Sequence, residues 1–543
     1  MTGFEVKKRD GLARISSLSL PHEQIHLPCA RDTDLLFPEL ASLSMTNVPL
    51  SAPAQFASAY LPGRSGRIVM VNPAVAPSAS SGDIIMVPNW NAAFSNPRNY
   101  TDWLVHLKST LPPDTAWYAP GAALPSNAHM LCYSGFDLFD FIAVDLRSAQ
   151  HTFCLPEGEF PEEIMETGVC GCQGCREGNL LVHNRLALSR ELSLISRFIA
   201  DQQLREFAES RCRMQATHTA ILRHLDRHYS FMEQNVPVAR HCRLGAMTGE
   251  ALVRPEVARF ADRVVNRYIP PAADVAVLLP CSARKPYSLS QSHRKYLETV
   301  GGRALELIVT SPLGLVPRDL ERVYPAAHYD IPVTGHWDRE ELSFTAGIIG
   351  RFLGKHAFRR VIAHLDGGAL EATRMAAGIA EIAIEESCIS RPAAQDSLRN
   401  LGVLLDGERQ VSYDPVRGTL SWQFGVDVNT AGMSVRWKPP NLMVRRGKEP
   451  LFSLDPGTGF LRPTFEGWKL LPGTCRVGID NFVPQGDILA PGVLTADPAI
   501  REGDEVLVEG PRAMATGRAA MGASEMQASK RGIAVRVRKV LKH

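Results

Sequence analysis

The sequence predicts a multidomain protein in which an α/β core is followed by β-rich domains. A chain of 543 residues exceeds what one hydrophobic core supports, so it should divide into several domains. Between residues 257 and 390, short apolar runs alternate with helical patterns, which is typical of an α/β domain with a parallel sheet. After residue 418 the chain changes to short runs separated by turn residues, which indicates β structure.

The composition excludes several classes of protein. With 45% hydrophobic and 21% charged residues, the chain is an ordinary globular sequence. Its formal net charge of +2 predicts no global attraction to polyanions, so any nucleic-acid surface must come from local clustering. Residues 1–10 are charged where a signal peptide is apolar, and no apolar run reaches membrane-spanning length. Eleven cysteines, an odd number, favour metal or thiol chemistry over disulfides. We therefore expect a cytoplasmic protein without a membrane partner.

The first third of the chain carries a metal-binding pattern. Three cysteines lie within one short loop and a histidine follows them: Cys170, Cys172, Cys175 and His183. Three thiolates and one imidazole at this spacing predict a closed tetrahedral zinc site, and a closed site is structural. The alternatives are a chance cysteine cluster or a redox pair. Residues 186–228 then follow a helical pattern that no proline interrupts.

The central domain contains the most informative segment. The apolar run 274–280 predicts a buried parallel strand, which places Cys281 at its carboxyl end, where open α/β sheets bind ligands. After Pro286, a helix capped by Ser288 or Ser290 should carry His293 on its first turn, facing back toward the loop.

The same segment brings reactive side chains together. It holds a thiol, an ammonium, a phenol, a hydroxyl and an imidazole, on Cys281, Lys285, Tyr287, Ser290 and His293. A thiolate needs a nearby positive charge or a helix N-terminus to lower its pKa, and this segment supplies both. The alternative is a small buried cysteine beside a solvated lysine. Two later strand ends, at Ser311 and Asp366, also carry polar groups suited to a ligand crevice, although Asp-Gly is a common turn pair as well.

The end of the chain is strongly basic. Residues 530–542 contain six basic residues and no acidic one, and valine alternates with arginine. This pattern predicts a strand with one buried face and one cationic face that follows phosphates. We expect the RNA contacts to come from Lys530, Arg531, Arg536, Arg538 and Lys539. The alternative is a solvated edge strand whose charges prevent aggregation.

The central segment also carries a family resemblance. Residues 280–293 fit the pattern Pro-Cys-x3-Lys-Pro-Tyr-x2-Ser-x2-His at every fixed position, and residues 311–317 and 324–337 extend the likeness. This resembles the archaeosine synthase family. The resemblance implies an enzyme that adds the amino group of free lysine to the nitrile of 7-cyano-7-deazaguanine in the D-loop of tRNA, forming an amidine. It adds His328 and Asp330 to Ser311 and Asp366 as expected substrate-binding residues.

The resemblance also bears on partners and cofactors. In the family a radical-SAM lyase partner then cleaves the lysine adduct. ATP should be unnecessary, because amine addition to a nitrile needs no activation of an acid and the chain has no Gly-x4-Gly-Lys-Ser/Thr motif.

The flanking regions resemble tRNA-guanine transglycosylases. Residues 4–14 are similar to the opening strand of those TIM-barrel enzymes, and residues 135–140 place Asp140 in the position of their nucleophile. Their general-acid motif Asp-Ser-Gly-Gly-Phe-Gln is absent, and the expected region reads Met-Thr-Asn-Val-Pro-Leu at residues 45–50. Exchange of a base needs an acid or base as well as a nucleophile, so we expect a degenerate TIM-like barrel kept for tRNA docking or as a scaffold.

The expected organisation has four parts. They are a degenerate TIM-like barrel with its zinc site at 1–235, a catalytic α/β domain with a parallel sheet at 250–395, a small β-rich domain at 405–472, and a domain at 473–543 that resembles the PUA fold, an RNA-binding β-barrel. Two other functions stay open at this point. One is a transglycosylase that exchanges the base, and the other is a non-catalytic tRNA-binding factor.

Overall fold

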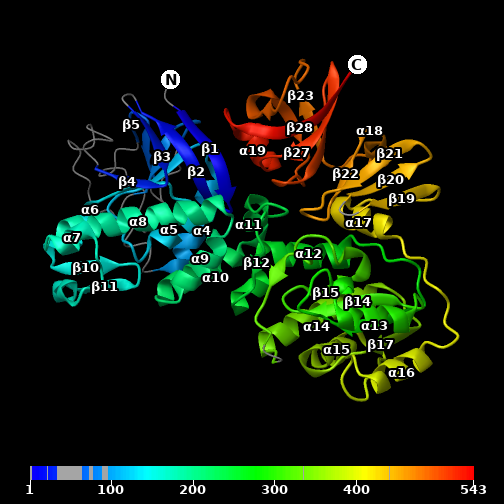
Figure 1. Cartoon of the computed structure of the whole chain (residues 1–543). Coiled ribbons are helices and arrows are strands. Elements are labelled where there is room, and N and C mark those ends of the chain that lie inside the picture. The colour runs from blue at the N-terminus through cyan, green and yellow to red at the C-terminus, as the bar shows by residue number, and fades with distance from the viewer. Residues whose placement is uncertain are drawn as a thin grey trace. The chain divides into compact units, whose positions relative to one another are not determined.

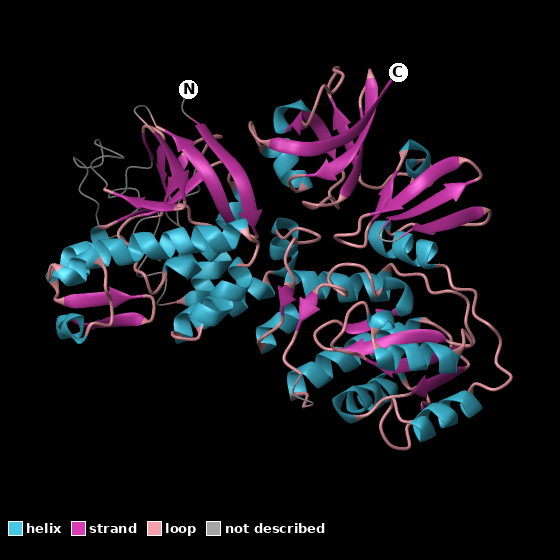
Figure 2. Ribbon diagram, in the orientation of Figure 1, coloured by secondary structure: helices cyan, strands magenta, loops and turns pink. Residues whose placement is uncertain are grey.

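The computed structural model describes most of the chain, and Figures 1 and 2 show its course. The described residues are 3–20, 23–32, 64–71, 78–87, 96–333, 336–438 and 441–543. The stretch 45–50, which stands where transglycosylases carry their general-acid motif, lies outside them. The chain forms two compact units, of which the first is Met1–Pro237, Val477–Asp504 and Val508–His543 and the second is Val238–Arg476 and Glu505–Leu507.

The first unit contains a six-stranded, mostly parallel sheet. Its strand order is β4-β9-β8-β7-β6-β5, and only β5 runs antiparallel to its neighbour. The strands are β4 (Cys29–Arg31), β5 (Arg64–Ser65), β6 (Ile68–Met70), β7 (Ile84–Met86), β8 (Ala116–Ala119) and β9 (Leu138–Asp140). Strands β5 to β9 follow one another in sequence and lie side by side, as strands do in a β/α barrel, while β4 pairs with β9.

The two faces of this sheet are covered differently. Val69 and Ile85 point into a core shared with helices α4 (Pro97–Thr110) and α8 (Leu180–Ala200). Ile68 and Ile84 lie in a second core with the antiparallel sheet of β1 (Gly3–Asp10), β2 (Ala13–Ser19) and β3 (Gln24–Leu27). Within the described residues the strands do not close into a ring, so the TIM-like barrel stays a prediction and the observed architecture is a mixed α/β domain.

The helical pattern at 186–228 forms three helices rather than one. These are α8, α9 (Leu204–Cys212) and α10 (Ala216–Arg227). The first break lies at Gln202, whose φ of 58° is in the left-handed region, and Asp10 accepts a hydrogen bond of 2.7 Å from the first backbone N–H of α9, on Leu204. No proline or glycine marks this break in the sequence, so the pattern alone could not show it.

The second unit is built around the expected parallel sheet. Its strand order is β15-β14-β13-β17-β18, and only β15 is antiparallel. The strands are β13 (Val275–Pro280), β14 (Leu305–Thr310), β15 (Gly314–Pro317), β17 (Arg360–Ala363) and β18 (Glu385–Glu386).

Helices cover both faces of this sheet, as Figure 2 shows. Alternate residues of β13 belong to two different cores, because successive side chains of a strand point to opposite faces. One core includes residues of α12 (Pro255–Asn266), α14 (Arg339–Lys355) and α15 (Gly367–Ala380). The other includes residues of α13 (Gln291–Val300) and α16 (Gln395–Leu404). A sheet buried on both faces explains why β13 is a continuous apolar run and why β14 is apolar except for Glu306 and Thr310.

The rest of the chain is mainly β structure. Four antiparallel strands come first: β19 (Met433–Lys438), β20 (Asn441–Arg446), β21 (Glu449–Leu454) and β22 (Leu461–Pro463). A six-stranded sheet of order β24-β28-β27-β26-β23-β25 follows. Its strands are β23 (Arg476–Ile479), β24 (Ile488–Leu489), β25 (Val493–Ala496), β26 (Glu505–Glu509), β27 (Ala513–Ala519) and β28 (Ile533–Lys542). None of the helices in the described parts is both long and apolar enough to cross a bilayer.

Candidate active site and metal centre

Cys281 lies where the sequence predicted it, directly after β13. Pro280 pairs with Val309 of the neighbouring parallel strand, so Cys281 and Ser311 emerge from adjacent strand ends. Cys281 is exposed and lines a cavity of about 280 Å³. Ser311, Trp337 and Glu341 line the same cavity. The carboxyl edge of a parallel sheet therefore presents a thiol to a cavity that suits a small ligand.

Three hydroxyl groups near the Cys281 thiol form a hydrogen-bonded chain. The Tyr287 hydroxyl is 2.8 Å from the hydroxyl of Tyr329, which is 2.6 Å from Oγ1 of Thr310. All three side chains are buried. Each hydroxyl can both donate and accept, so the chain can pass a proton along its length. Tyr329 and Thr310 were not among the residues that the sequence singled out.

The electrostatics of Cys281 differ from the expectation. Desolvation raises the pKa of its thiol, and this outweighs a hydrogen bond with Thr310 and the positive charge of Lys285, both of which lower it. Desolvation also lowers the pKa of Lys285, although Cys281 and Asp330 act in the opposite direction. The Lys285 ammonium lies 3.8 Å from the centre of the Tyr329 ring. Desolvation therefore favours the neutral thiol and the neutral amine, which narrows the difference between the pKa values of Cys281 and Lys285.

Ser290 and His293 have structural partners. Ser290 is the N-cap of α13 and its Oγ accepts a hydrogen bond of 3.2 Å from the His293 backbone N–H, which confirms the expected helix start. The His293 ring faces back toward the loop, as predicted, with Nε2 at 2.9 Å from the carbonyl oxygen of Pro280. It is fully buried and does not line the cavity beside Cys281.

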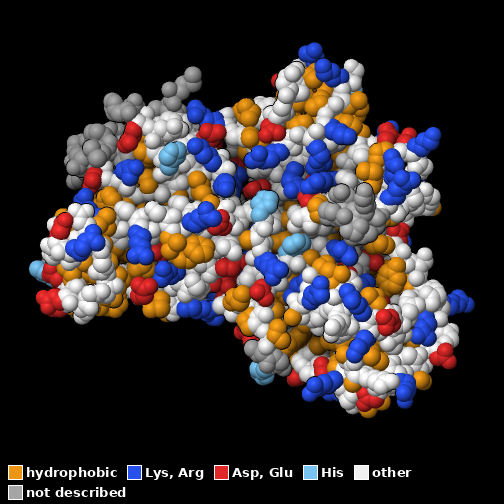
Figure 3. Space-filling view, viewed as in Figure 1, with side chains coloured by type: hydrophobic (Ala, Val, Ile, Leu, Met, Phe, Trp, Pro, Cys, Tyr) orange, Lys and Arg blue, Asp and Glu red, His pale blue; other side chains and the backbone are white. Residues whose placement is uncertain are grey.

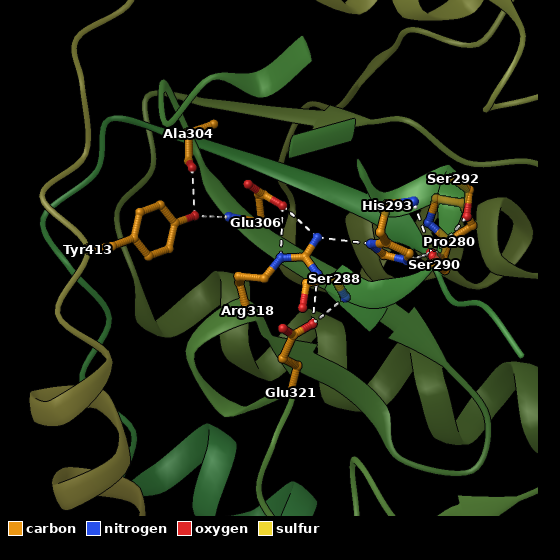
Figure 4. Close-up of polar contacts among 10 residues, drawn as sticks. All are labelled: Pro280, Ser288, Ser290, Ser292, His293, Ala304, Glu306, Arg318, Glu321 and Tyr413. Atoms are coloured by element: carbon orange, nitrogen blue, oxygen red, sulfur yellow. Dashed lines mark hydrogen bonds and ion pairs between the residues drawn. The ribbon is translucent and has the colours of Figure 1, made fainter. Parts of the chain in front are cut away.

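His293 contacts a buried network of charged side chains (Figure 4). The Arg318 guanidinium lies 2.9 Å from His293 Nδ1 and forms ion pairs with Glu306 at 2.6 Å and Glu321 at 2.9 Å. Glu321 also accepts a hydrogen bond of 2.9 Å from the Ser288 backbone N–H. Burial and the charge of Arg318 lower the pKa of His293 to about 3. The imidazole is therefore neutral. Arg318 links His293 directly, and the Ser288 backbone through Glu321, to β14 and to the turn after β15.

The expected substrate-binding residues lie in different places. Ser311 lines the cavity and its hydroxyl donates to Glu341 at 2.7 Å. Asp330 is exposed, and its charge acts on Lys285. Asp366 is exposed at the start of α15, where its side chain makes no capping hydrogen bond. His328 is half-buried and its ring lies 5.9 Å from the ring of Tyr324. Asp330, Asp366 and His328 do not line the cavity beside Cys281.

Trp337 was missed in the sequence because its role depends on a distant glycine. A Cβ atom at Gly368 would lie 2.5 Å from Cγ of Trp337, so only glycine allows this close approach. The start of α15 thus packs against an aromatic wall of the cavity. The consecutive pair Gly367-Gly368 after a strand was the available signal.

The four predicted metal ligands come together in the first unit. The ligand atoms of Cys170, Cys172, Cys175 and His183 all lie within 4.8 Å of one another. His183 Nδ1 is 3.3 Å from both the Cys172 and the Cys175 sulfur. Its other nitrogen lies 3.1 Å from the carbonyl oxygen of Cys154, the kind of contact that orients a ligating imidazole. The group is suited to a tetrahedral metal such as zinc.

The local structure around these four residues explains why their ligand atoms lie close together. Cys172 caps the short helix α7 (Gln173–Arg176), and the Asn179 side chain accepts a hydrogen bond from Val182 at the start of α8. A Cβ at Gly174 would lie 2.3 Å from the His183 backbone nitrogen. Gly174 thus allows the cysteine loop to pack against the first turn of the helix that carries His183. The Phe153 ring stacks on the imidazole with centroids 3.7 Å apart.

Comparison of the sequence with known proteins identifies the family of this chain. Residues 257–405 match a model described as a domain of unknown function (DUF5591), and residues 475–541 match the PUA domain. The archaeosine synthase subunit alpha of Methanosarcina acetivorans is 35% identical, with 99% of each chain covered. The archaeosine synthase of Haloferax volcanii is 36% identical, again with 99% of each chain covered. The chain belongs to the archaeosine synthase family.

A more distant relative is a transglycosylase. The tRNA-guanine(15) transglycosylase of Methanobrevibacter smithii is 24% identical, covering 82% of this chain and 70% of its own. In this archaeosine synthase family member, Asp140 is buried and accepts hydrogen bonds from the Tyr118 hydroxyl at 2.7 Å and from the Gly121 and Ile142 backbone at 3.0 Å. Both carboxylate oxygens of Asp140 thus accept hydrogen bonds.

The PUA domain carries the basic segment. Arg536, Arg538 and Lys539 are exposed on β28, and Lys530 and Arg531 are exposed just before it. Figure 3 shows Lys and Arg side chains on the lobe that holds β27 and β28. The expected alternation holds over residues 535–538, where Val535 is buried, Val537 is half-buried and both arginines are exposed. It is lost afterwards, because Val540 and Leu541 are exposed as well. The pairing with β27 is irregular between Thr516 and Gly517, which shifts the register of the later residues.

Proposed function

We propose that this protein modifies tRNA by adding the amino group of free lysine to the nitrile of 7-cyano-7-deazaguanine, which forms an amidine. The observation that carries the proposal is the position of Cys281 at the edge of a small cavity, with Lys285 and the Tyr287–Tyr329–Thr310 hydroxyl chain beside it. Membership of the archaeosine synthase family and the PUA domain support it.

In the first step the Cys281 sulfur attacks the nitrile carbon. A carbon–sulfur bond forms, one π bond of the nitrile breaks, and its electron pair moves to nitrogen. The proton of the thiol is transferred to that nitrogen, so the product is a neutral thioimidate. The desolvated thiol needs a base, and Lys285 is suited because desolvation lowers the pKa of its ammonium.

In the second step the amine displaces the thiol. The neutral amine nitrogen attacks the thioimidate carbon, a carbon–nitrogen bond forms, and the carbon–sulfur bond breaks. The proton lost by the attacking amine returns to the Cys281 sulfur. The amidine then contains all atoms of the nitrile and the amine, and no oxidant, reductant or nucleotide is consumed.

Within this proposal the five residues of the reactive segment have different roles. Cys281 is the nucleophile, and Lys285 and Tyr287 move protons. Ser290 and His293 are positioning residues, because Ser290 caps α13 and His293 contacts the carbonyl that precedes Cys281. Asp330, Asp366, His328 and Ser311 stay proposed contacts of the substrate, of which Ser311 lies in the cavity wall.

The other parts of the chain would bind zinc and tRNA. We assign zinc to Cys170, Cys172, Cys175 and His183, where it would crosslink the cysteine loop to α8 and take no part in the reaction. The basic side chains of the PUA domain would bind the tRNA backbone. A radical-SAM lyase would act afterwards on the lysine adduct.

The decisive experiment is nucleoside mass spectrometry of tRNA that carries the nitrile base, incubated with the full chain and lysine. We expect a mass increase equal to one lysine in the wild type and none in Cys281→Ala, which should still bind tRNA. Without lysine, mass spectrometry of the protein after nuclease digestion of the tRNA should find the modified nucleotide attached to Cys281. Normal turnover by Cys281→Ala would exclude the covalent route. Release of the free base from the tRNA would instead indicate a transglycosylase.

A further inference from the structure

The cavity beside Cys281 has a second polar side that the proposed mechanism does not use. It is formed by Asp338 and Glu341, which lie at the start of α14. Much of the remaining lining is apolar and includes Met247, Leu252 and Trp337. No lysine or arginine occurs among the described residues that line the cavity.

Glu341 is held in a fixed position by two hydrogen bonds. Its Oε1 accepts from the Ser311 hydroxyl at 2.7 Å, and its Oε2 accepts from the Asp338 backbone N–H at 3.1 Å. Ser311 is itself buried, with 5% of its surface exposed. A carboxylate oxygen has two lone pairs, so each oxygen of Glu341 can accept one more hydrogen bond. The carboxylate is thus preorganised for a further donor.

The size and charge of the cavity indicate what that donor is. A volume of about 280 Å³ is at the lower limit for small-molecule sites, so it suits a small metabolite rather than a nucleotide. Two carboxylates belong to the described lining, whose other ionisable side chains are Cys281 and His336, and Lys285 is not part of it. This lining favours a cation and disfavours phosphate. A lining that combines a thiol, a carboxylate and apolar side chains matches an aliphatic chain with a reactive group at one end and an ammonium at the other.

We propose that Glu341, assisted by Asp338, binds the ammonium group of the amine donor that does not react, so that the cavity selects aliphatic amines with a second cationic end. This inference rests on the proposed function, because it assigns the donor to the cavity that contains Cys281. Ser311 then acts as a positioning residue, since it fixes the Glu341 carboxylate through its hydroxyl.

The capping box of α14 is the competing explanation for Glu341, and one substitution separates the two roles. Glutamine can serve at the same position of a capping box: its carbonyl oxygen can accept from the Asp338 backbone N–H while its amide N–H donates to the Ser311 hydroxyl oxygen, and the charge is removed. Glu341→Gln should therefore fold normally and raise the KM for lysine about tenfold to a hundredfold, as expected for loss of a charge-assisted hydrogen bond. The KM for tRNA should not change. Glu340→Gln is the matched control, because Glu340 precedes Glu341 on α14 but does not line the cavity.

A donor series tests the selectivity directly. The wild type should use lysine and 1,5-diaminopentane much better than pentylamine, and Glu341→Gln should lose most of this preference. An unchanged KM for lysine in Glu341→Gln, or equal use of pentylamine by the wild type, would overturn the inference.

A measurement without nitrile chemistry separates this inference from the proposed function. Because Cys281 lines the same cavity, a bound amine should slow its alkylation by iodoacetamide. We expect 1,5-diaminopentane to protect Cys281 in the wild type and much less in Glu341→Gln. If protection is seen but lysine never adds to the tRNA, the amine site stands and the proposed function fails. If lysine adds but protection is equal in both proteins, the proposed function stands and the amine site fails.

Discussion

The Arg318 guanidinium donates a hydrogen bond of 2.9 Å to Nδ1 of His293, and this contact fixes the protonation of a buried imidazole. Arginine can only donate, so Nδ1 must be the acceptor and the ring proton must be on Nε2. Nε2 then donates to the carbonyl oxygen of Pro280 at 2.9 Å, directly before Cys281. The neutral ring therefore contacts the backbone directly before the thiol, and in the proposed mechanism it is a positioning residue.

His293 should make the stability of the second unit depend on pH. Burial and Arg318 lower its pKa to about 3, below the usual value of 6.5. Below pH 6.5 the unfolded chain binds a proton at this ring that the folded chain does not, so stability is full above pH 6.5 and falls progressively toward pH 3. The loss is at most about 1.4 kcal/mol per pH unit.

Thermal unfolding at pH 7, 6 and 5 measures this effect. We expect the unfolding temperature of the wild type to fall with pH and that of His293→Gln to fall less steeply, because glutamine does not titrate. His543→Gln, at the exposed end of the chain, should keep the slope of the wild type. An identical slope in His293→Gln would show that His293 is not the titrating group.

The hydroxyl chain predicts a specific loss of rate. Tyr329→Phe removes the middle group, which bonds to Tyr287 and Thr310, and should lower the rate of adduct formation about a hundredfold while tRNA binding is unchanged. Tyr324→Phe is the matched control, because the buried Tyr324 hydroxyl has no hydrogen-bond partner among the described residues. Single-turnover kinetics on nitrile-bearing tRNA would measure both. Equal rates for the two variants would show that the chain only fills space.

The sequence predicted those parts of the fold that depend on local pattern. The apolar run before Cys281 is a buried strand, and Ser290 is the cap of the next helix, because burial on both faces and capping leave direct signals in sequence. The cysteine spacing predicted a cluster that the structure brings within 4.8 Å.

What the sequence could not show depends on contacts between distant segments. Arg318 follows His293 by 25 residues, and the strand pairing that brings them together is not visible in either segment. The raised pKa of the Cys281 thiol could not be predicted either. Its desolvation comes from all the residues packed around it, whereas the sequence shows only the neighbouring Lys285. The sequence did not single out Glu341, because Asp338 and Glu341 have the spacing of a capping box and a capping box occurs whether or not a ligand binds.

The cysteine cluster predicts a metal whose removal affects stability first. Cys172→Ser should lose the bound zinc and lower the unfolding temperature of the first unit, since a structural zinc site contributes directly to folding. Cys29→Ser, at another cysteine of this unit that is not in the cluster, should keep the metal. Elemental analysis and calorimetry of the full-length proteins provide the measurement. A metal-free wild type with normal stability would contradict the assignment.

The basic side chains of β28 predict how tRNA binding depends on salt. Arg536 and Arg538 are exposed there, and each arginine that binds a phosphate adds a released counterion to the binding equilibrium. Replacing both with glutamine should weaken tRNA binding and lower the slope of log Kd against log salt by about 0.7 to 0.9 for each phosphate that is no longer neutralised. Point variants suit this test better than removal of residues 474–543, because an Arg9–Glu525 ion pair connects the PUA domain to β1 of the first unit.

The matched control for the two arginines is Arg351→Gln, which removes one exposed charge from α14 in the second unit. Its affinity and salt slope should equal those of the wild type. If the β28 double variant also keeps the slope of the wild type, its arginines do not bind phosphate and the strand is a solvated edge whose charges prevent aggregation. Titration by fluorescence anisotropy at several salt concentrations distinguishes the two outcomes, because neutralising a phosphate changes the slope and a purely structural substitution changes only the affinity.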